Sequence, residues 1–61
     1  MQYITDWFIC EDLALNNTEK VIDLYAKAGF SVKKMKQERE QVNGWDKFRF
    51  VIEFEKRLNN D

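Results

Sequence analysis

The chain has 61 residues, and its ten basic and eleven acidic side chains leave a formal net charge of −1. This balance excludes a global field that would attract nucleic acid or an anionic membrane. One cysteine and no histidine exclude an intrachain disulfide and an ordinary zinc site, and we expect no cofactor. Residues 1–61 suffice for one small domain, which buries only about 60% of its unfolded surface. An aromatic-rich core or self-association must therefore supply the stability.

No apolar run approaches the roughly 20 residues of a membrane span, and no signal-peptide pattern opens the chain. Cys10, the lone cysteine, fits a reducing compartment and is expected to be a small buried residue. We therefore expect a cytoplasmic protein without a membrane partner. Order is expected from end to end, except at Met1 and in the polar tail, residues 59–61.

The first predicted element is a strand over residues 2–10. Alternation would put Tyr3, Thr5, Trp7 and Ile9 on one face, and Ile4, Asp6, Phe8 and Cys10 on the other. Both faces are largely apolar, which is typical of a strand covered on both sides. A half-exposed Trp7 or Tyr3 is the other interpretation, since single exposed aromatic residues are common.

A helix is predicted over residues 18–28, after a polar connection over residues 11–17. Asn17 or Thr18 can cap its N-terminus, and Gly29 is a stop signal. Helical spacing predicts one buried stripe that consists of Val21, Leu24, Tyr25 and Ala28. The two leucines of the connection, Leu13 and Leu15, would lie under the sheet.

Two further strands, over residues 30–41 and 45–57, are predicted to form a hairpin. Asn43-Gly44 between them is the favoured sequence of a two-residue type I′ turn. In the last strand large apolar residues recur at every second position, namely Phe48, Phe50, Ile52 and Phe54. Met35 is out of phase with the apolar residues before it, which predicts a β-bulge near Lys33 and Lys34.

The charges fix the hairpin register. A two-residue loop gives three opposite-charge pairs, Glu40 with Lys47, Glu38 with Arg49, and Lys34 with Glu53. A shift of one residue in either direction creates like-charge pairs, which are unfavourable across strands. The favoured register places Met35 opposite Ile52 on the core face.

The predicted fold class is α+β: a three-stranded sheet in β-α-β-β order, with the last strand central and one helix packed on one face. The two outer strands would be parallel to each other. Ile52 would lie at the centre of the core, beneath Leu24 and Tyr25. A helix of 11 residues is about 16 Å long, whereas the hairpin arms extend about 36 Å.

This difference in length predicts uncovered apolar surface. Phe48 and Phe50 would lie beyond the helix, and Trp45, Val42 and Val51 would form a second apolar cluster on the opposite face. The candidate interface residues are therefore Trp7, Trp45, Phe48, Phe50, Val51, Arg39 and Val42. Alternatively, the long stems of Arg39, Gln37 and Lys47 shield the rings.

No catalytic constellation is present, because the chain has no histidine to act as a general base and no phosphate-binding glycine loop. Glu53 and Glu55 share one strand face, but each has a basic neighbour and is expected to form an ordinary ion pair. A local basic patch consists of Lys33, Lys34, Lys36, Arg39, Lys47 and Arg49. Interleaved glutamates cancel most of its field, so nucleic-acid binding is a weaker alternative to protein binding.

Two stretches, residues 24–32 (LYAKAGFSV) and 50–56 (FVIEFEK), resemble those of tiny bacterial and phage proteins with a strand–helix–hairpin layout and no assigned function. In these proteins the helix ends in glycine and an aromatic residue, often tryptophan, where this chain has Phe30. The resemblance implies the fold and no catalytic residue. Short chains of this kind, rich in lysine and asparagine, also look like accessory products of phages, and many such products are stoichiometric inhibitors of host enzymes or defence complexes.

We therefore expect a non-enzymatic interaction protein, a phage- or prophage-type inhibitor or modulator of a host defence or nucleic-acid-processing complex, in the cytoplasm of a bacterial cell. Surplus apolar surface also predicts a homodimer that pairs sheet edges or faces. The alternatives are a nucleic-acid-binding protein that uses the basic hairpin face, and a dimer that sequesters a small ligand.

Overall fold

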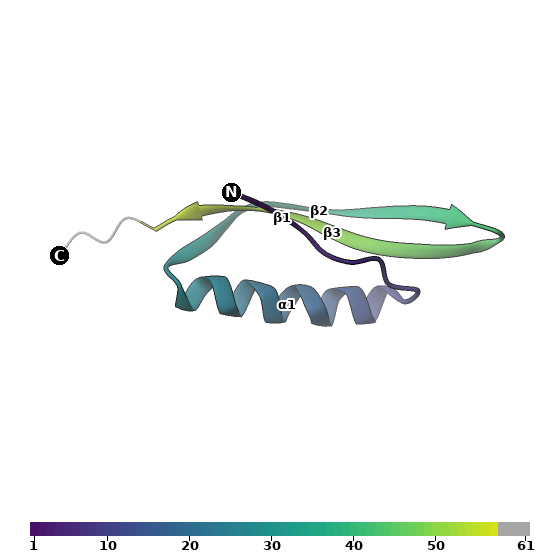
Figure 1. The fold of residues 1–61 in the computed structure, drawn as a ribbon, viewed down its shortest axis with the longest axis horizontal. Helices are drawn as coiled ribbons and strands as arrows, with labels where there is room; N and C mark the ends of the chain where they lie inside the picture. The colour runs from purple at the N-terminus through teal and green to yellow at the C-terminus, as the bar shows by residue number, and fades with distance from the viewer. Residues whose placement is uncertain (58–61) are drawn as a thin grey trace.

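The computed structural model describes residues 1–57 and contains strand β1 (Gln2–Ile4), helix α1 (Glu11–Lys27), strand β2 (Phe30–Val42) and strand β3 (Trp45–Lys56) (Figure 1). The sheet order is β1-β3-β2, and β3 is antiparallel to both neighbours. Helix α1 runs along one face of this sheet. The predicted α+β fold with a central last strand is thus confirmed. The predicted polar tail lies outside the described residues.

The Asn43-Gly44 turn forms as predicted. Val42 pairs with Trp45, and both turn residues have positive φ, 51° at Asn43 and 85° at Gly44. These angles are those of a type I′ turn, whose twist matches the twist of the flanking strands. All three predicted charge pairs lie opposite each other in the ladder: Lys34–Glu53, Glu38–Arg49 and Glu40–Lys47.

The predicted bulge is also present, because the register shifts between Val32 and Lys34. The shift places Met35 opposite Ile52, as the charge argument required. Ile52 is fully buried at the centre of the core, whereas Met35 lies on the outer strand and is 43% exposed. This register therefore buries Ile52 but not Met35, which was expected to be buried as well.

The predicted helix start was wrong by seven residues, because α1 begins at Glu11 rather than at residue 18. The buried stripe consists of Ala14, Thr18 and Val21, and Thr18 Oγ1 donates to the Ala14 carbonyl at 2.8 Å. Small and polar residues give a weak apolar signal, yet they allow a helix to approach a sheet closely. Thr18 is therefore a core residue, and neither it nor Asn17 caps the helix.

Three leucines assigned to the interior are exposed instead. Leu24 is 65% exposed, Leu13 51% and Leu15 42%. Ile52 is therefore not covered by Leu24, and Ala28 lies just beyond the helix at its C-cap. Tyr25 does pack on the sheet, stacked on Phe54 with ring centroids 4.2 Å apart. Gly29 has a φ of 92°, and its N–H donates to the Ala26 carbonyl, so the predicted stop is confirmed.

The first strand is much shorter than the predicted 2–10, because β1 ends at Ile4. At the next position Thr5 Oγ1 accepts the Phe50 N–H at 2.9 Å, in place of a backbone carbonyl, and the side chain is buried. The backbone then pairs with β3 again at the Phe8–Phe48 bridge. At the other end Met1 is not loose, since its backbone exchanges hydrogen bonds with Phe54.

The longer helix reduces the predicted mismatch between helix and hairpin to the hairpin tip. Seventeen residues span about 26 Å, and Glu11 Oε2 accepts a hydrogen bond from Gln37 Nε2 at 2.8 Å. The helix therefore starts beside the middle of β2 and covers Phe50, which is 8% exposed. Phe48 is half-buried and packs against the same core together with Phe8. The expectation that these two rings are left uncovered was wrong.

We predict that Gly44→Val lowers the free energy of unfolding by about 1–3 kcal/mol, since a β-branched residue is strained at positive φ. Urea denaturation followed by circular dichroism measures the change. Asn43→Gly is the matched control, because glycine adopts the Asn43 conformation without strain. Equal midpoints for Gly44→Val and the parent protein would contradict the assigned turn.

A second prediction concerns Cys10, which is exposed rather than buried and occupies the N-cap position of α1. Its backbone angles, φ −133° and ψ 134°, are those of a capping residue, but its side chain makes no capping hydrogen bond. Cys10→Ser should raise the free energy of unfolding by about 1 kcal/mol, because a serine hydroxyl can accept a free N–H of the first turn. Cys10→Ala is the control, and a gain as large as that of serine would rule out capping as the cause.

Candidate functional site

The candidate site lies on the sheet face opposite α1, called here the outer face, and at the hairpin tip. The outer face carries the odd-numbered residues of β3 from Trp45 to Glu53 and their partners in β2, because side chains alternate between the two faces. The tip comprises residues 40–47, which project past the start of α1 (Figure 1).

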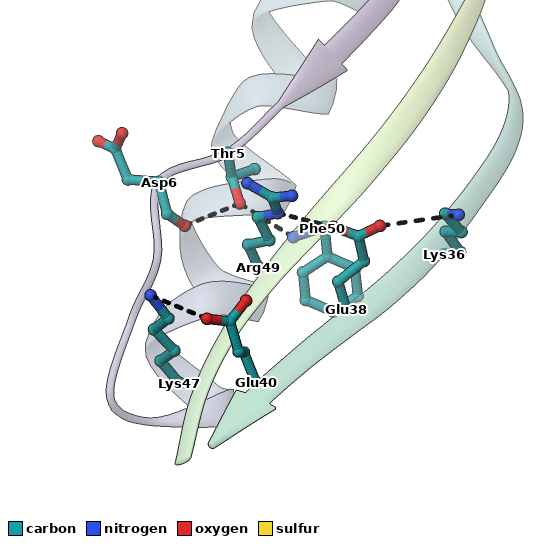
Figure 2. Close-up of polar contacts among 8 residues, drawn as sticks. All are labelled: Thr5, Asp6, Lys36, Glu38, Glu40, Lys47, Arg49 and Phe50. Carbon is teal, nitrogen blue, oxygen red and sulfur yellow. Dashed lines mark hydrogen bonds and ion pairs between the residues drawn. The ribbon is translucent and has the colours of Figure 1, made fainter. Parts of the chain in front are cut away.

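Ion pairs cover the outer face, and all but the Lys36–Glu38 pair join β2 to β3. Glu38 lies at their centre: it accepts a hydrogen bond from Arg49 Nε at 2.7 Å and lies 3.7 Å from Lys36 Nζ (Figure 2). Lys47 pairs with Glu40 at 3.7 Å, and Lys33 with Glu53 at 3.6 Å. These contacts hold the strands in register and leave little uncompensated charge.

The predicted basic patch is divided between two faces and carries no positive field: Arg39, opposite Phe48, lies on the helix face, whereas Lys34, Lys36, Lys47 and Arg49 lie on the outer face. Five of its six residues are ion-paired, namely Lys33, Lys36, Arg39, Lys47 and Arg49. The sixth, Lys34, faces Glu53 in the ladder. A phosphate backbone would have to displace these carboxylates, which weakens the case for nucleic-acid binding.

The hydrogen bond from Arg49 holds the pKa of Glu38 below its ordinary value, and the charges of Arg49 and Lys36 act in the same direction. Desolvation opposes this shift but is the smaller influence. Glu38 is thus a carboxylate at neutral pH and acts as the fixed negative centre of the outer face.

Trp7 lies over the cationic part of this face. The Arg49 guanidinium is 4.2 Å and the Lys47 ammonium 4.6 Å from its ring centroid. Such cation–π contacts contribute about 0.5–1 kcal/mol each at exposed sites. The ring is half-buried, which agrees with the alternative of a half-exposed Trp7. A strand covered on both faces was wrong, because Trp7 lies outside β1 and Ile4 of β1 is 49% exposed.

Trp45 is the large apolar side chain that the tip leaves open, with 53% of its surface exposed. Val42 lies opposite it and is half-buried. Val51 lies six residues further along β3, about 20 Å away, between Ile4 and Lys36, and is 8% exposed. The predicted cluster of Trp45, Val42 and Val51 was therefore wrong: only the first two are neighbours.

The remaining candidate interface residues belong either to the core or to the hairpin tip. Phe50 belongs to the core, and Phe48 packs on it. Arg39 is exposed and pairs with Asp46 at 3.7 Å. Ile9 follows the Phe8 bridge and is 69% exposed, although it was not among the candidate interface residues.

A surface depression of about 380 Å³ also lies on the outer face, lined by Gln2, Lys34, Met35, Lys36, Val51 and Glu53. Its lining carries both signs of charge, so it favours no single class of charged ligand. Within residues 1–57 there is no group of three or more side chains suited to bind a metal ion. In the same part of the chain, no helix has the length and apolarity needed to cross a membrane.

Comparison of the chain with protein-family models, with curated proteins and with solved structures finds no match in any of the three. The resemblance to tiny bacterial and phage proteins therefore depends on residues 24–32 and 50–56 alone.

We predict that Arg49→Gln raises the pKa of Glu38, because the strongest stabiliser of its charged form is lost. A carboxyl whose folded pKa is depressed adds stability above its unfolded pKa, and this contribution disappears as the pH falls through the folded value. Loss of Arg49 should reduce that acid-dependent change in stability. An NMR titration of the Glu38 carboxyl carbon measures the pKa. Lys36→Gln is the control and should produce a smaller rise; a larger one would assign the central role to Lys36.

Proposed function

We propose that this protein is a non-enzymatic binding module that engages a larger protein through its hairpin tip, with Trp45 as the anchor. The observation that carries the proposal is a large aromatic ring, 53% exposed, at the end of an arm that projects past the helix. Tryptophan is among the residues most enriched at interface positions that contribute most to binding.

The form of the arm supports this role. The type I′ turn and the paired charges hold the tip in one conformation before binding, so little conformational entropy is lost when a partner docks. The ion pair Lys47–Glu40 lies next to the apolar pair Trp45 and Val42 on the outer face, and Arg39–Asp46 lies on the opposite face of the tip. An apolar centre with a polar rim is the usual composition of protein interfaces.

The resemblance suggests the class of partner. It favours a phage- or prophage-type inhibitor or modulator of a host defence or nucleic-acid-processing complex, which acts by stoichiometric binding. We place this action in the cytoplasm of a bacterial host, where the exposed Cys10 would remain a thiol. We also propose that the protein self-associates as a homodimer, since β2 is a long outer strand.

Photo-crosslinking tests the proposal. Benzoylphenylalanine placed at position 45 in bacterial cells should form a covalent product with a larger protein, and Trp45→Ala should weaken binding of that protein about 30-fold. The matched control is position 24, because Leu24 is 65% exposed but lies on the helix. Crosslinking there should give no such product.

Three outcomes would overturn the proposal. Identical products from positions 45 and 24 would remove the tip as the site. Binding by Trp45→Ala equal to that of the parent protein would remove the anchor. Capture that disappears after nuclease treatment, with an affinity that falls steeply with salt, would favour the nucleic-acid alternative.

A further inference from the structure

Strand β2 forms one side of the sheet, and within residues 1–57 no strand pairs with its outer edge. The backbone hydrogen bonds of β3 show which N–H and C=O groups of β2 face that edge. Phe48 exchanges both backbone hydrogen bonds with Phe8, so it points its N–H and C=O away from β2. The direction of the N–H and C=O groups alternates along a strand. The β2 residues that lie opposite even-numbered β3 residues therefore point their N–H and C=O groups towards the open edge. These residues are Met35, Gln37, Arg39 and Gln41.

We infer that this edge pairs with β2 of a second copy, antiparallel and with the two-fold axis at Gln37, to form one six-stranded sheet. The inference rests on the proposed self-association and gives it a geometry. It uses the strand edge and is independent of what the hairpin tip binds.

The charges of β2 select this register. With Gln37 opposite its own copy, Lys36 faces Glu38 of the second copy and Lys34 faces Glu40, each pair occurring twice because of the two-fold symmetry. These four residues share the outer face, where directly opposed side chains of opposite charge attract. The basic first half of β2 thus complements its acidic second half when the strand is turned end to end.

Neighbouring registers with the same hydrogen-bond pattern place like charges on the axis. An axis at Lys36 would set this residue against itself, and an axis at Glu38 would do the same for the glutamate. A parallel arrangement would bring residues 33–36, which include three lysines, beside their own copies. Like charges directly opposite each other destabilise a ladder. An axis at Lys36 keeps one kind of favourable pair, Lys34 with Glu38, and an axis at Glu38 keeps Lys36 with Glu40, whereas the axis at Gln37 gives two kinds and no like-charge pair. The charges of the edge therefore favour this register over its nearest competitors.

The helices leave room for this pairing. Glu11 contacts Gln37 at the start of α1, and the helix then runs back towards Phe30, so each helix runs away from the axis. On the helix face Met35, 43% exposed, would face Arg39 of the second copy, whose apolar stem can cover it. Leu15, 42% exposed, lies one turn after Glu11 on the same flank of α1. Pairing thus adds cover on the side of the fold where apolar surface is open.

Disulfide trapping tests the register. In a Cys10→Ser background, Gln37→Cys should form a linked dimer in a glutathione redox buffer, because residues opposite each other in a hydrogen-bonded pair have Cα atoms about 5.5 Å apart, within disulfide range. Met35→Cys and Arg39→Cys lie on the same face of the same strand and are the matched controls. Each alone would hold its thiols about 13 Å apart and should not link. A mixture of these two variants should link, since Met35 faces Arg39.

Light scattering of the parent protein separates the failure of this geometry from the failure of self-association. The expected mass is twice 7.4 kDa at micromolar concentration. A mass of 7.4 kDa over the whole dilution range would overturn both. A dimer whose Gln37→Cys variant does not link, or in which Met35→Cys links alone, would overturn the edge register and leave self-association through another surface.

Discussion

The register of the β2–β3 hairpin is the constraint on which the rest of the structure depends. Positive φ at both Asn43 and Gly44 closes the loop with two residues, and every later pair follows from this closure. A shift of one residue would turn Ile52 and Phe54 from the core to solvent. Such a shift would also reverse which backbone groups of β2 face the open edge. One turn therefore fixes the core, the outer face and the open edge.

The helix is adapted to this sheet by the size of its residues rather than by a long apolar stripe. Ala14 and Thr18 have no exposed surface, and the Thr18 hydroxyl is bonded within the helix, so it adds no unsatisfied polar group to the core. Close approach at these two positions brings Tyr25 onto Phe54 and lets 17 residues cover the sheet as far as Phe50. The apolar side chains that this contact does not use, such as Leu24, remain in solvent.

Two separate surfaces follow from this arrangement. The tip presents Trp45 beyond the helix, where folding does not require its burial. The open edge of β2 presents backbone groups and a charge pattern that is complementary to itself. The ion pairs of the outer face lie between them and compensate the basic residues, so charge on this face acts by selecting register and not by attracting polyanions.

The sequence by itself determined the fold class, the turn, the bulge and the hairpin register, because these depend on local backbone preferences and on pairs brought together by one short loop. It did not determine where α1 begins or where β1 ends. Ala14 and Thr18 give no strong apolar signal, and Thr5 ends the strand by using its own hydroxyl in place of a backbone carbonyl. The same holds for the candidate site. The exposure of Trp45 beside its turn could be anticipated from the sequence. The burial of Phe50 depended on a longer helix, and the burial of Val51 depended on strand neighbours distant in the chain. Only the tertiary structure decided these points, because burial depends on which other segments arrive at a surface.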